Sequence, residues 1–277
     1  NRVRSASVCM AILVAAAAPA VDFPQGVVFY LSLDEIRSGG VAPDMSGSNR
    51  NARAVSTKWS AGRLNAAVEL GAKNSCLVLT NQPVLNPKRL TLSAWFKTDK
   101  SSVADRYLFD KRADSGYALR ILGGPAESAR RGKLCFTVSG HDCVSDKAVT
   151  DGAWHHGAAT FDGEALKLYV DGQVQAQVTA WKGEPASNAH DLTLGMNRSN
   201  PTAKEKDVAL DGALDEVVLF GRALSADEIK SVGNAAKPKF TKSQVARRLA
   251  ELKDLRDRGL ILQDFYERKV QECEVVP

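Results

Sequence analysis

Carboxylates are the side chains of this sequence with the clearest chemical potential, and three of them, Asp211, Asp215 and Glu216, lie close together in the chain. Two carboxyl groups about 5 to 5.5 Å apart can act as nucleophile and general acid in the hydrolysis of a glycosidic bond. Asp215 and Glu216 are adjacent, however, and adjacent side chains of a strand point to opposite faces. The spacing does not predict a catalytic pair, and we expect no enzymatic activity.

Histidines offer a second chemistry, the binding of a metal ion. His155 and His156 are adjacent, so in a strand their rings diverge and cannot share one ion. The two other histidines, His141 and His190, do not stand at ligand spacing from this pair. We therefore expect packing or hydrogen-bonding roles for His155 and His156.

Tryptophans are candidates for stacking against a sugar ring. Trp59, Trp95 and Trp154 lie in apolar strand patterns, so we expect them in the core. Trp181 stands beside the turn-forming residues 182–185 in a predicted loop. Trp181 is therefore the aromatic candidate for a ligand-binding role.

Basic residues gather at Arg130 and Arg131, in a predicted loop tip that could contact an anionic polysaccharide, whereas the more common role of such a cluster is a solvated turn. The net charge of the chain is +5. The excess positive charge comes from Arg2 and Arg4 and from the residues after 236. The β-strand region between them is nearly neutral. The sequence therefore indicates no nucleic-acid-binding surface.

The elements that must position these side chains are short β-strands. Within residues 166–178, apolar side chains alternate with mostly polar ones, which predicts strands with one buried face. Strands of five to seven residues, separated by turn-forming residues, continue this pattern from residue 92 onward, and the spacing is typical of a β-sandwich. The apolar members of the alternating run are Leu166, Leu168, Val170, Val174, Ala176 and Val178.

An Asp-Gly turn sets the register between the two strands of this run. A two-residue turn would place Leu168 opposite Gln175 and so mix apolar and polar side chains on one face. A three-residue loop of residues 170–172 pairs Leu168 with Val174 and requires a positive φ only at Gly172. We therefore predict the three-residue loop.

Several motifs, in order along the chain, carry a resemblance to a known fold. Residues 92–97, 116–120, 154–172 and 212–220 are similar to successive strands of the laminin G-like jelly rolls of the concanavalin A-like lectin/glucanase fold. The central motifs are Trp154-His155-His156, Phe161-Asp162-Gly163 and Leu168-Tyr169-Val170-Asp171-Gly172. The resemblance covers roughly residues 26–232 and implies a mainly β protein, an antiparallel β-sandwich jelly roll.

The resemblance bears on catalysis and on metal binding. A glucanase of this fold would carry a Glu-x-Asp-x-x-Glu run, and the sequence has none. The family often carries a structural Ca²⁺, which the resemblance places at Asp34 and Asp215, with Asn51 and its loop supplying further oxygens. The alternative is that these side chains accept backbone hydrogen bonds in turns. Ala52-Arg53 stands where the family loop has glycine.

The N-terminal residues have the pattern of a leader rather than of a folded domain. Arg2 and Arg4 precede a short apolar run, and residues 18–20 form a small-residue cleavage site, so we predict a signal peptide at 1–20. The apolar run is too short to span a membrane, and the mature chain is expected to have no integral span. The predicted location is secreted, periplasmic or at the cell surface, with a β-sandwich over residues 22–233.

After the sandwich, the period of the sequence changes to that of helices. Residues 234–240 form a predicted linker, and residues 241–277 a helical hairpin that resembles the SHOCT domain. Its narrow apolar stripe must dock on something, and we favour self-association or a protein partner. The expected function is a non-catalytic binding or adhesion module for a glycan or a surface protein. The alternative is an assembly protein in which the sandwich is a spacer.

Four cysteines follow the predicted leader: Cys76, Cys135, Cys143 and Cys273. Cys135 and Cys143 flank a turn-like segment, so an exported chain could bridge them. If that turn were a regular four-residue loop, the two would be three positions out of register, beyond usual disulfide reach. Free buried thiols are the alternative.

Overall fold

The structure is a computed structural model. It describes residues 24–71, 74–99, 102–112, 115–179, 182–197, 209–234 and 242–260, together with residues 263, 266 and 270. No helix among these residues is both long and apolar enough to span a membrane. The predicted signal peptide, most of the linker and most of the second helix of the hairpin lie outside the described residues.

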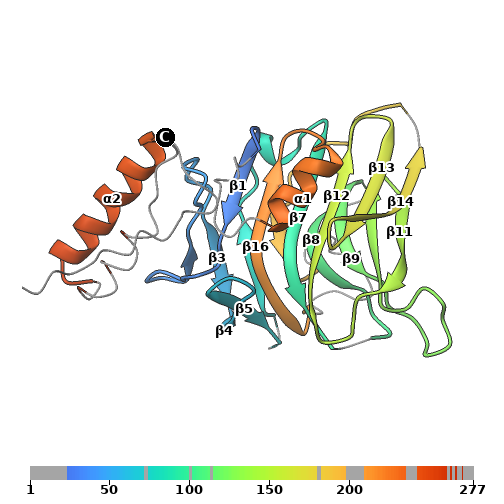
Figure 1. Cartoon of the computed structure of the whole chain (residues 1–277), viewed down its shortest axis with the longest axis horizontal. Helices are drawn as coiled ribbons and strands as arrows, with labels where there is room; N and C mark the ends of the chain where they lie inside the picture. Colours follow the sequence, from blue (N-terminus) through green and yellow to red (C-terminus); the bar gives the residue numbers. More distant parts are fainter. Residues whose placement is uncertain are drawn as a thin grey trace, which may run out of the picture.

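Two antiparallel eight-stranded sheets pack face to face, as the sequence predicted (Figure 1). Sheet A runs in the order β14 (Gln173–Thr179), β13 (Ala165–Val170), β12 (Trp154–Phe161), β7 (Leu90–Lys97), β16 (Gly212–Phe220), β5 (Ala66–Leu70) and β4 (Lys58–Ala61), and β1 (Val27–Leu31) also pairs with β16. Sheet B runs in the order β11 (His141–Ala148), β10 (Lys133–Val138), β9 (Gly116–Ile121), β8 (Arg106–Arg112), β15 (Leu192–Leu194), β6 (Cys76–Leu79), β3 (Ala52–Val55) and β2 (Val41–Ala42). A short 3₁₀ helix, η1 (Pro83–Leu85), precedes β7.

The alternation along β7 shows how the strands divide their side chains between core and surface. Leu92 and Phe96 are fully buried in the core between the sheets. Because successive side chains alternate, Trp95 points with Lys97 to the outer face of sheet A. Trp95 and Trp154 are only half-buried, and Trp59, on the edge strand β4, is 44% exposed, so the prediction that these tryptophans belong to the core was wrong.

The hairpin between β13 and β14 differs from the predicted one. Its turn has two residues, Asp171 and Gly172, both with positive φ, at 51° and 73°. The prediction of a three-residue loop was therefore wrong. A bulge after the first two pairs leaves Gln175 as the extra residue, so Leu168 pairs with Ala176 instead of Val174. The bulge restores the apolar face that a two-residue turn would otherwise have disrupted.

Helix α1 (Ala226–Asn234) covers one half of the outer face of sheet A (Figure 1). A capping box opens the helix: the Glu228 carboxylate accepts the Ser225 N–H at 2.8 Å, and the Ser225 hydroxyl accepts the Glu228 N–H at 3.2 Å. Ile229 of α1 belongs to the same apolar cluster as Tyr169 of β13. Leu168 faces the core and Tyr169 faces α1, which is why both neighbours are buried.

Helix α2 (Lys242–Asp257) lies beside the sandwich and away from α1 (Figure 1). It ends before Gly259, which has φ 67°. Two polar contacts join α2 to the segment between β1 and β3: Arg247 donates to the Gly47 carbonyl at 2.9 Å, and Glu251 lies 3.6 Å from Arg37. The helical period of this region is confirmed, and Val245 and Leu252 of its apolar stripe are buried within this single chain. The SHOCT resemblance and the self-association of the stripe stay predictions.

Cys76, Cys135 and Cys143 are buried thiols. The turn between β10 and β11 has two residues, not four, so Phe136 pairs with Cys143 and Cys135 pairs with Val144. Cys135 and Cys143 are thus offset by one position and point to opposite faces. Cys273 lies outside the described residues.

Gly157 in β12 has a packing role. Pairing is continuous across it on both sides, with Ala94 and with Val170, so it marks no bulge. A Cβ at this position would lie 2.9 Å from the Phe96 ring and 3.1 Å from Leu134. We expect Gly157→Val to lower the free energy of unfolding by about 1 to 3 kcal/mol through overpacking, measured by urea denaturation. A neutral result would show that Phe96 can move aside.

Lys111, at the end of β8, is fully buried. Its ammonium group donates to three oxygens of the neighbouring loops: Asn81 Oδ1 at 3.0 Å, Asn188 Oδ1 at 3.1 Å and the His190 carbonyl at 2.5 Å. The carbonyl of Asn188 lies at 3.4 Å. A single lysine therefore joins two loops at one end of the sandwich.

Candidate functional site

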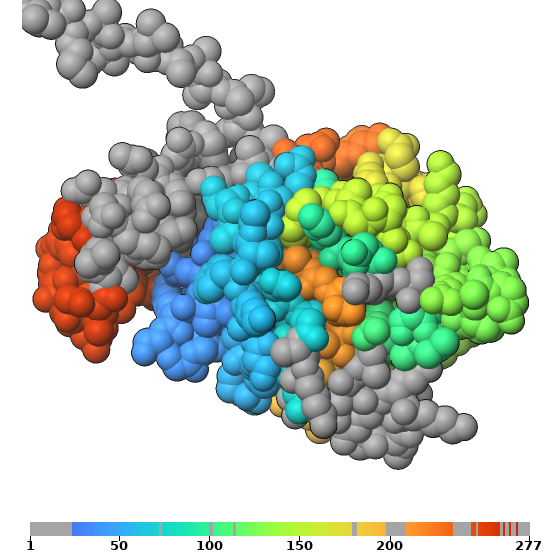
Figure 2. Space-filling view, turned by 90° about the horizontal axis from the view of Figure 1, so that it is seen from below, coloured from blue at the N-terminus to red at the C-terminus, as the bar shows by residue number. Residues whose placement is uncertain are grey.

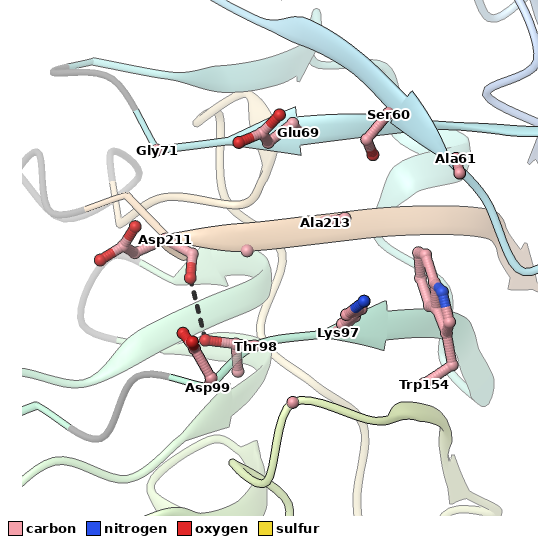
Figure 3. A pocket seen from close by; sticks show the side chains of 12 residues that line it. Ser60, Ala61, Glu69, Gly71, Lys97, Thr98, Asp99, Trp154, Asp211 and Ala213 are labelled. Carbon is pink, nitrogen blue, oxygen red and sulfur yellow. Dashed lines mark hydrogen bonds between the residues drawn. The ribbon is translucent and has the colours of Figure 1, made fainter.

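The uncovered half of the outer face of sheet A is the candidate site. Pairing across four strands places one side chain from each in a row: Glu69 of β5, Ala213 of β16, Lys97 of β7 and Trp154 of β12. Paired residues of antiparallel strands share a face, so the four side chains line the same surface. Figure 3 shows this row from close by.

An open groove of about 720 Å³ runs along this row. In Figure 2, β16 is visible in orange between the light-blue surface of the β4–β5 region and the green surface on its other side. Figure 3 places Glu69, Asp99 and Asp211 at one end of the groove and Trp154 at the other, with Lys97 between them. The remaining lining residues are Ser60, Ala61, Gly71, Thr98, Gly152, Gly212 and Ala213.

Backbone contacts and glycines shape the acidic end. The Thr98 hydroxyl donates to the Asp211 carbonyl at 2.9 Å, and the Gly152 N–H donates to the Thr98 carbonyl at 3.1 Å. A Cβ at Gly212 would lie 2.2 Å from the Lys97 carbonyl, so this floor position requires glycine. A Cβ at Gly71 would lie 3.5 Å from the Asp211 carboxylate, so glycine there leaves that carboxylate open.

The neighbouring row of side chains on this face contains Trp95, and the turn between β4 and β5 covers it. The Arg63 guanidinium lies 4.7 Å from the centre of the Trp95 ring. The Trp95 ring also lies 5.5 Å from the ring of His156, centre to centre. Trp154 has no such cation above it among the described residues, so its ring is open toward the groove.

His155 and His156 have different roles, in agreement with their predicted divergence. His155 lies between two carboxylates, Asp171 at 2.8 Å and Asp151 at 3.0 Å. Burial alone would lower the pKa of His155, but these hydrogen bonds raise it above its ordinary value. His156 is buried, and its Nε2 lies 2.8 Å from the Ser93 hydroxyl.

Asp34 and Asp215 lie together beneath the turn between β4 and β5. The Asp215 carboxylate accepts the Leu64 N–H at 2.9 Å, and Asp34 accepts the Ala66 N–H at 3.3 Å. Burial, with a smaller contribution from Asp34, raises the pKa of Asp215 to about 7. The second oxygen of Asp215, Oδ1, is buried without a hydrogen-bond partner in the described structure. An orphaned carboxylate oxygen next to a second carboxylate fits the chemistry of a Ca²⁺ site.

Asn51 belongs to a separate hydrogen-bond cluster. Its side-chain oxygen accepts the Asp44 N–H at 2.8 Å. Asp44 in turn accepts the N–H groups of Tyr30 and Arg50, at 3.0 and 2.9 Å. These bonds hold the loop, and among the described residues no cluster of three or more His, Cys, Asp or Glu side chains could hold a metal ion.

The carboxylates near Asp215 do not form an accessible catalytic pair. A bulge between Asp215 and Val218, with Glu216 at φ 51°, breaks the alternation on which the sequence argument relied. The Tyr30 hydroxyl donates to Glu216. Asp215 is fully buried, so no substrate can reach its carboxylate.

The predicted basic tip lies in the loop between β9 and β10 and does not line the groove. The side chain of Arg130 is 59% exposed and lies 3.5 Å from Asp142. Arg131 follows it in the same loop, and Trp181 lies outside the described residues. The groove was not predicted from the sequence, and it is the pairing of Trp154 with Lys97 in the folded sheet that shows this tryptophan to face outward.

Two antiparallel sheets packed face to face, with a groove on one outer face, define a jelly-roll β-sandwich of the lectin type. Residues 71–230, more than half of the chain, match the family described as the concanavalin A-like lectin/glucanases superfamily, and the chain belongs to this family. No protein with a curated description matches the chain.

Solved structures with the same fold have low sequence identity to this chain. The binding domain of Paraclostridial Mosquitocidal Protein 1 has 17% identity and a TM-score of 0.58, with 76% of this chain and 52% of that one covered. Domain 4 of AbnA, an extracellular GH43 arabinanase from Geobacillus stearothermophilus solved with arabinotriose, has 15% identity and a TM-score of 0.58, with 76% and 98% covered. The binding domain of Botulinum Neurotoxin DC, solved with SialylT, has 12% identity and a TM-score of 0.56, with 77% and 52% covered. The chain thus spans about half the length of the two toxin binding domains.

Proposed function

We propose that this chain is an exported, non-catalytic module that binds a carbohydrate in the groove on sheet A. The observation that carries the proposal is the half-buried Trp154 at one end of an open groove whose other end holds carboxylates. An indole offers an apolar face for a sugar ring, and carboxylates and an ammonium group bind its hydroxyls. A face with these features favours binding over a role as a spacer for assembly.

Solved structures of the same fold support a carbohydrate as the ligand class. One structure of the same fold was solved with arabinotriose and another with a ligand named SialylT. A glycan on a cell surface or in a polysaccharide is the ligand class that we propose for this chain. The predicted leader at residues 1–20 is the basis for export, and Trp181, Arg130 and Arg131 are proposed as contacts outside the groove.

Trp154→Ala should weaken binding of the cognate glycan, identified on a glycan array, by about thirtyfold or ~2 kcal/mol, because truncation removes the stacking surface. Isothermal titration calorimetry measures the change. Trp59→Ala is the matched control, since Trp59 is exposed on the edge strand and does not line the groove. Equal affinity of the Trp154 variant and the wild type would rule out the groove as the site.

We also propose that Asp34 and Asp215 bind a structural Ca²⁺. Asn51 would be a further ligand, and its loop would have to turn inward to bring the side chain to the ion. The ion would supply positive charge to a buried carboxylate. Chelator should lower the melting temperature by about 5 to 10 °C if the ion is present at a hundredfold its dissociation constant. Asp34→Ala should lose this sensitivity, whereas Asp227→Ala, an exposed change on α1, should keep it. Identical melts with and without chelator would contradict the proposal.

A further inference from the structure

The distribution of charge in the groove indicates which class of saccharide it takes. Three carboxylates, Glu69, Asp99 and Asp211, line it against a single ammonium group, that of Lys97. None of the ion pairs among the described residues involves any of these four side chains. The lining side chains therefore carry a net negative charge. Lys58, which pairs with Glu69 across β4 and β5, lies beside the groove and does not line it.

The charges are also separated along the groove. The three carboxylates stand at the end opposite Trp154, and Lys97 lies between them and the indole (Figure 3). Glu69 and Asp99 are exposed and Asp211 is half-buried, so their oxygens are available to a ligand. A ligand long enough to reach from Trp154 to the far end would place one ring on the indole and another among the carboxylates.

We infer, on the basis of the proposed carbohydrate function, that the groove takes an oligosaccharide with free amino groups. An ammonium group on the ring at the acidic end forms charge-assisted hydrogen bonds with carboxylates, which are stronger than the bonds of a neutral hydroxyl. The ring on Trp154 contributes apolar contact and requires no charge. An acidic sugar at the same place would bring like charges together, which disfavours binding.

The test compares three oligosaccharides of equal length by isothermal titration calorimetry at low salt. They are a β-1,4-linked glucosamine hexamer with free amino groups, its fully N-acetylated form and a galacturonic acid hexamer. We expect the amino form to bind roughly tenfold more tightly than the N-acetylated form, and the acidic form to bind most weakly. The preference for the amino form should decrease as added salt screens the charges.

Two double variants that replace carboxylates by amides test whether the groove carboxylates cause the preference for the amino form. Glu69→Gln combined with Asp211→Asn should bring the ratio of the amino to the N-acetylated affinity close to one. Asparagine suits position 211, where φ is 55°. Glu127→Gln combined with Asp146→Asn removes the same charge from exposed positions outside the groove and should keep the ratio of the wild type.

The possible results distinguish a failure of this inference from a failure of the proposed carbohydrate-binding function. If the N-acetylated or the acidic hexamer binds the wild type as tightly as the amino form, or if the groove double variant keeps the preference, the inference is wrong. In that case, loss of binding in Trp154→Ala would still support the groove as a saccharide site. If Trp154→Ala binds every saccharide as the wild type does, the proposed site itself fails.

Discussion

Lys111→Met should lower the free energy of unfolding by about 3 to 5 kcal/mol, the largest effect that we expect of a single substitution outside the apolar core, because several acceptors lose one donor at once. Methionine keeps the length of the side chain but cannot donate a hydrogen bond. The oxygens of the half-buried residues Asn81, Asn188 and His190 that now accept from the ammonium group would lose that donor. Each such acceptor carries its own desolvation cost.

The size of this effect can be checked by urea denaturation at neutral pH, where the lysine is mainly protonated, since burial lowers its pKa to about 8. Lys88→Met is the control, because Lys88 is an exposed partner of Glu184 and such pairs contribute less than about 1 kcal/mol. If both variants lose the same small amount, the loops around Lys111 do not depend on its ammonium group.

Acidification should destabilise the protein through His156. Burial lowers the pKa of His156 to about 4, whereas the pKa of the same side chain in the unfolded chain is about 6.5. The unfolded chain therefore takes up the proton first as the pH falls. The stability that depends on a neutral His156 is complete above the unfolded pKa and is lost as the pH falls toward 4. At pH 4.5 the loss amounts to about 2.5 kcal/mol.

The contribution of His156 is separated from that of other groups by comparing variants. Between pH 7 and pH 4.5, the free energy of unfolding decreases in both proteins. We expect the decrease in His156→Gln to be about 2.5 kcal/mol smaller than in the wild type. Glutamine retains a partner for the Ser93 hydroxyl and does not titrate. His141→Gln, at an exposed position, should follow the wild type. Parallel pH profiles of the wild type and His156→Gln would refute the assignment.

The sandwich could be predicted because local rules agree over its whole length. Leu166 and Leu168 alternate with side chains of the other face, and Asp-Gly pairs separate the strands. The register of the last hairpin could not be predicted, because a bulge at Gln175 compensates for a turn that the face pattern seemed to exclude. A bulge adds one unpaired residue to a strand, and no particular residue type marks its position in the sequence.

The groove could not be predicted for a different reason. Glu69, Lys97, Trp154 and Asp211 are far apart in the chain and meet only through the order of strands in sheet A. Its extent also depends on α1, which covers one half of the face and leaves the other half open. The resemblance to a known fold placed Asp34 and Asp215 together, whereas the position of a ligand groove varies among proteins that share a fold.

The pairing of β1 with β16 has a consequence for how the chain folds during synthesis. Val27 pairs with Phe220, and β16 also lies between β7 and β5. Sheet A therefore lacks a central strand until nearly the whole sandwich sequence has left the ribosome. Such high contact order slows folding, because distant segments must meet before their contacts can stabilise anything. Nascent chains that end before residue 212 would expose the edges of β1, β5 and β7, and exposed strand edges promote aggregation. The protein can therefore complete its fold only if the chain does not aggregate before β16 is synthesised.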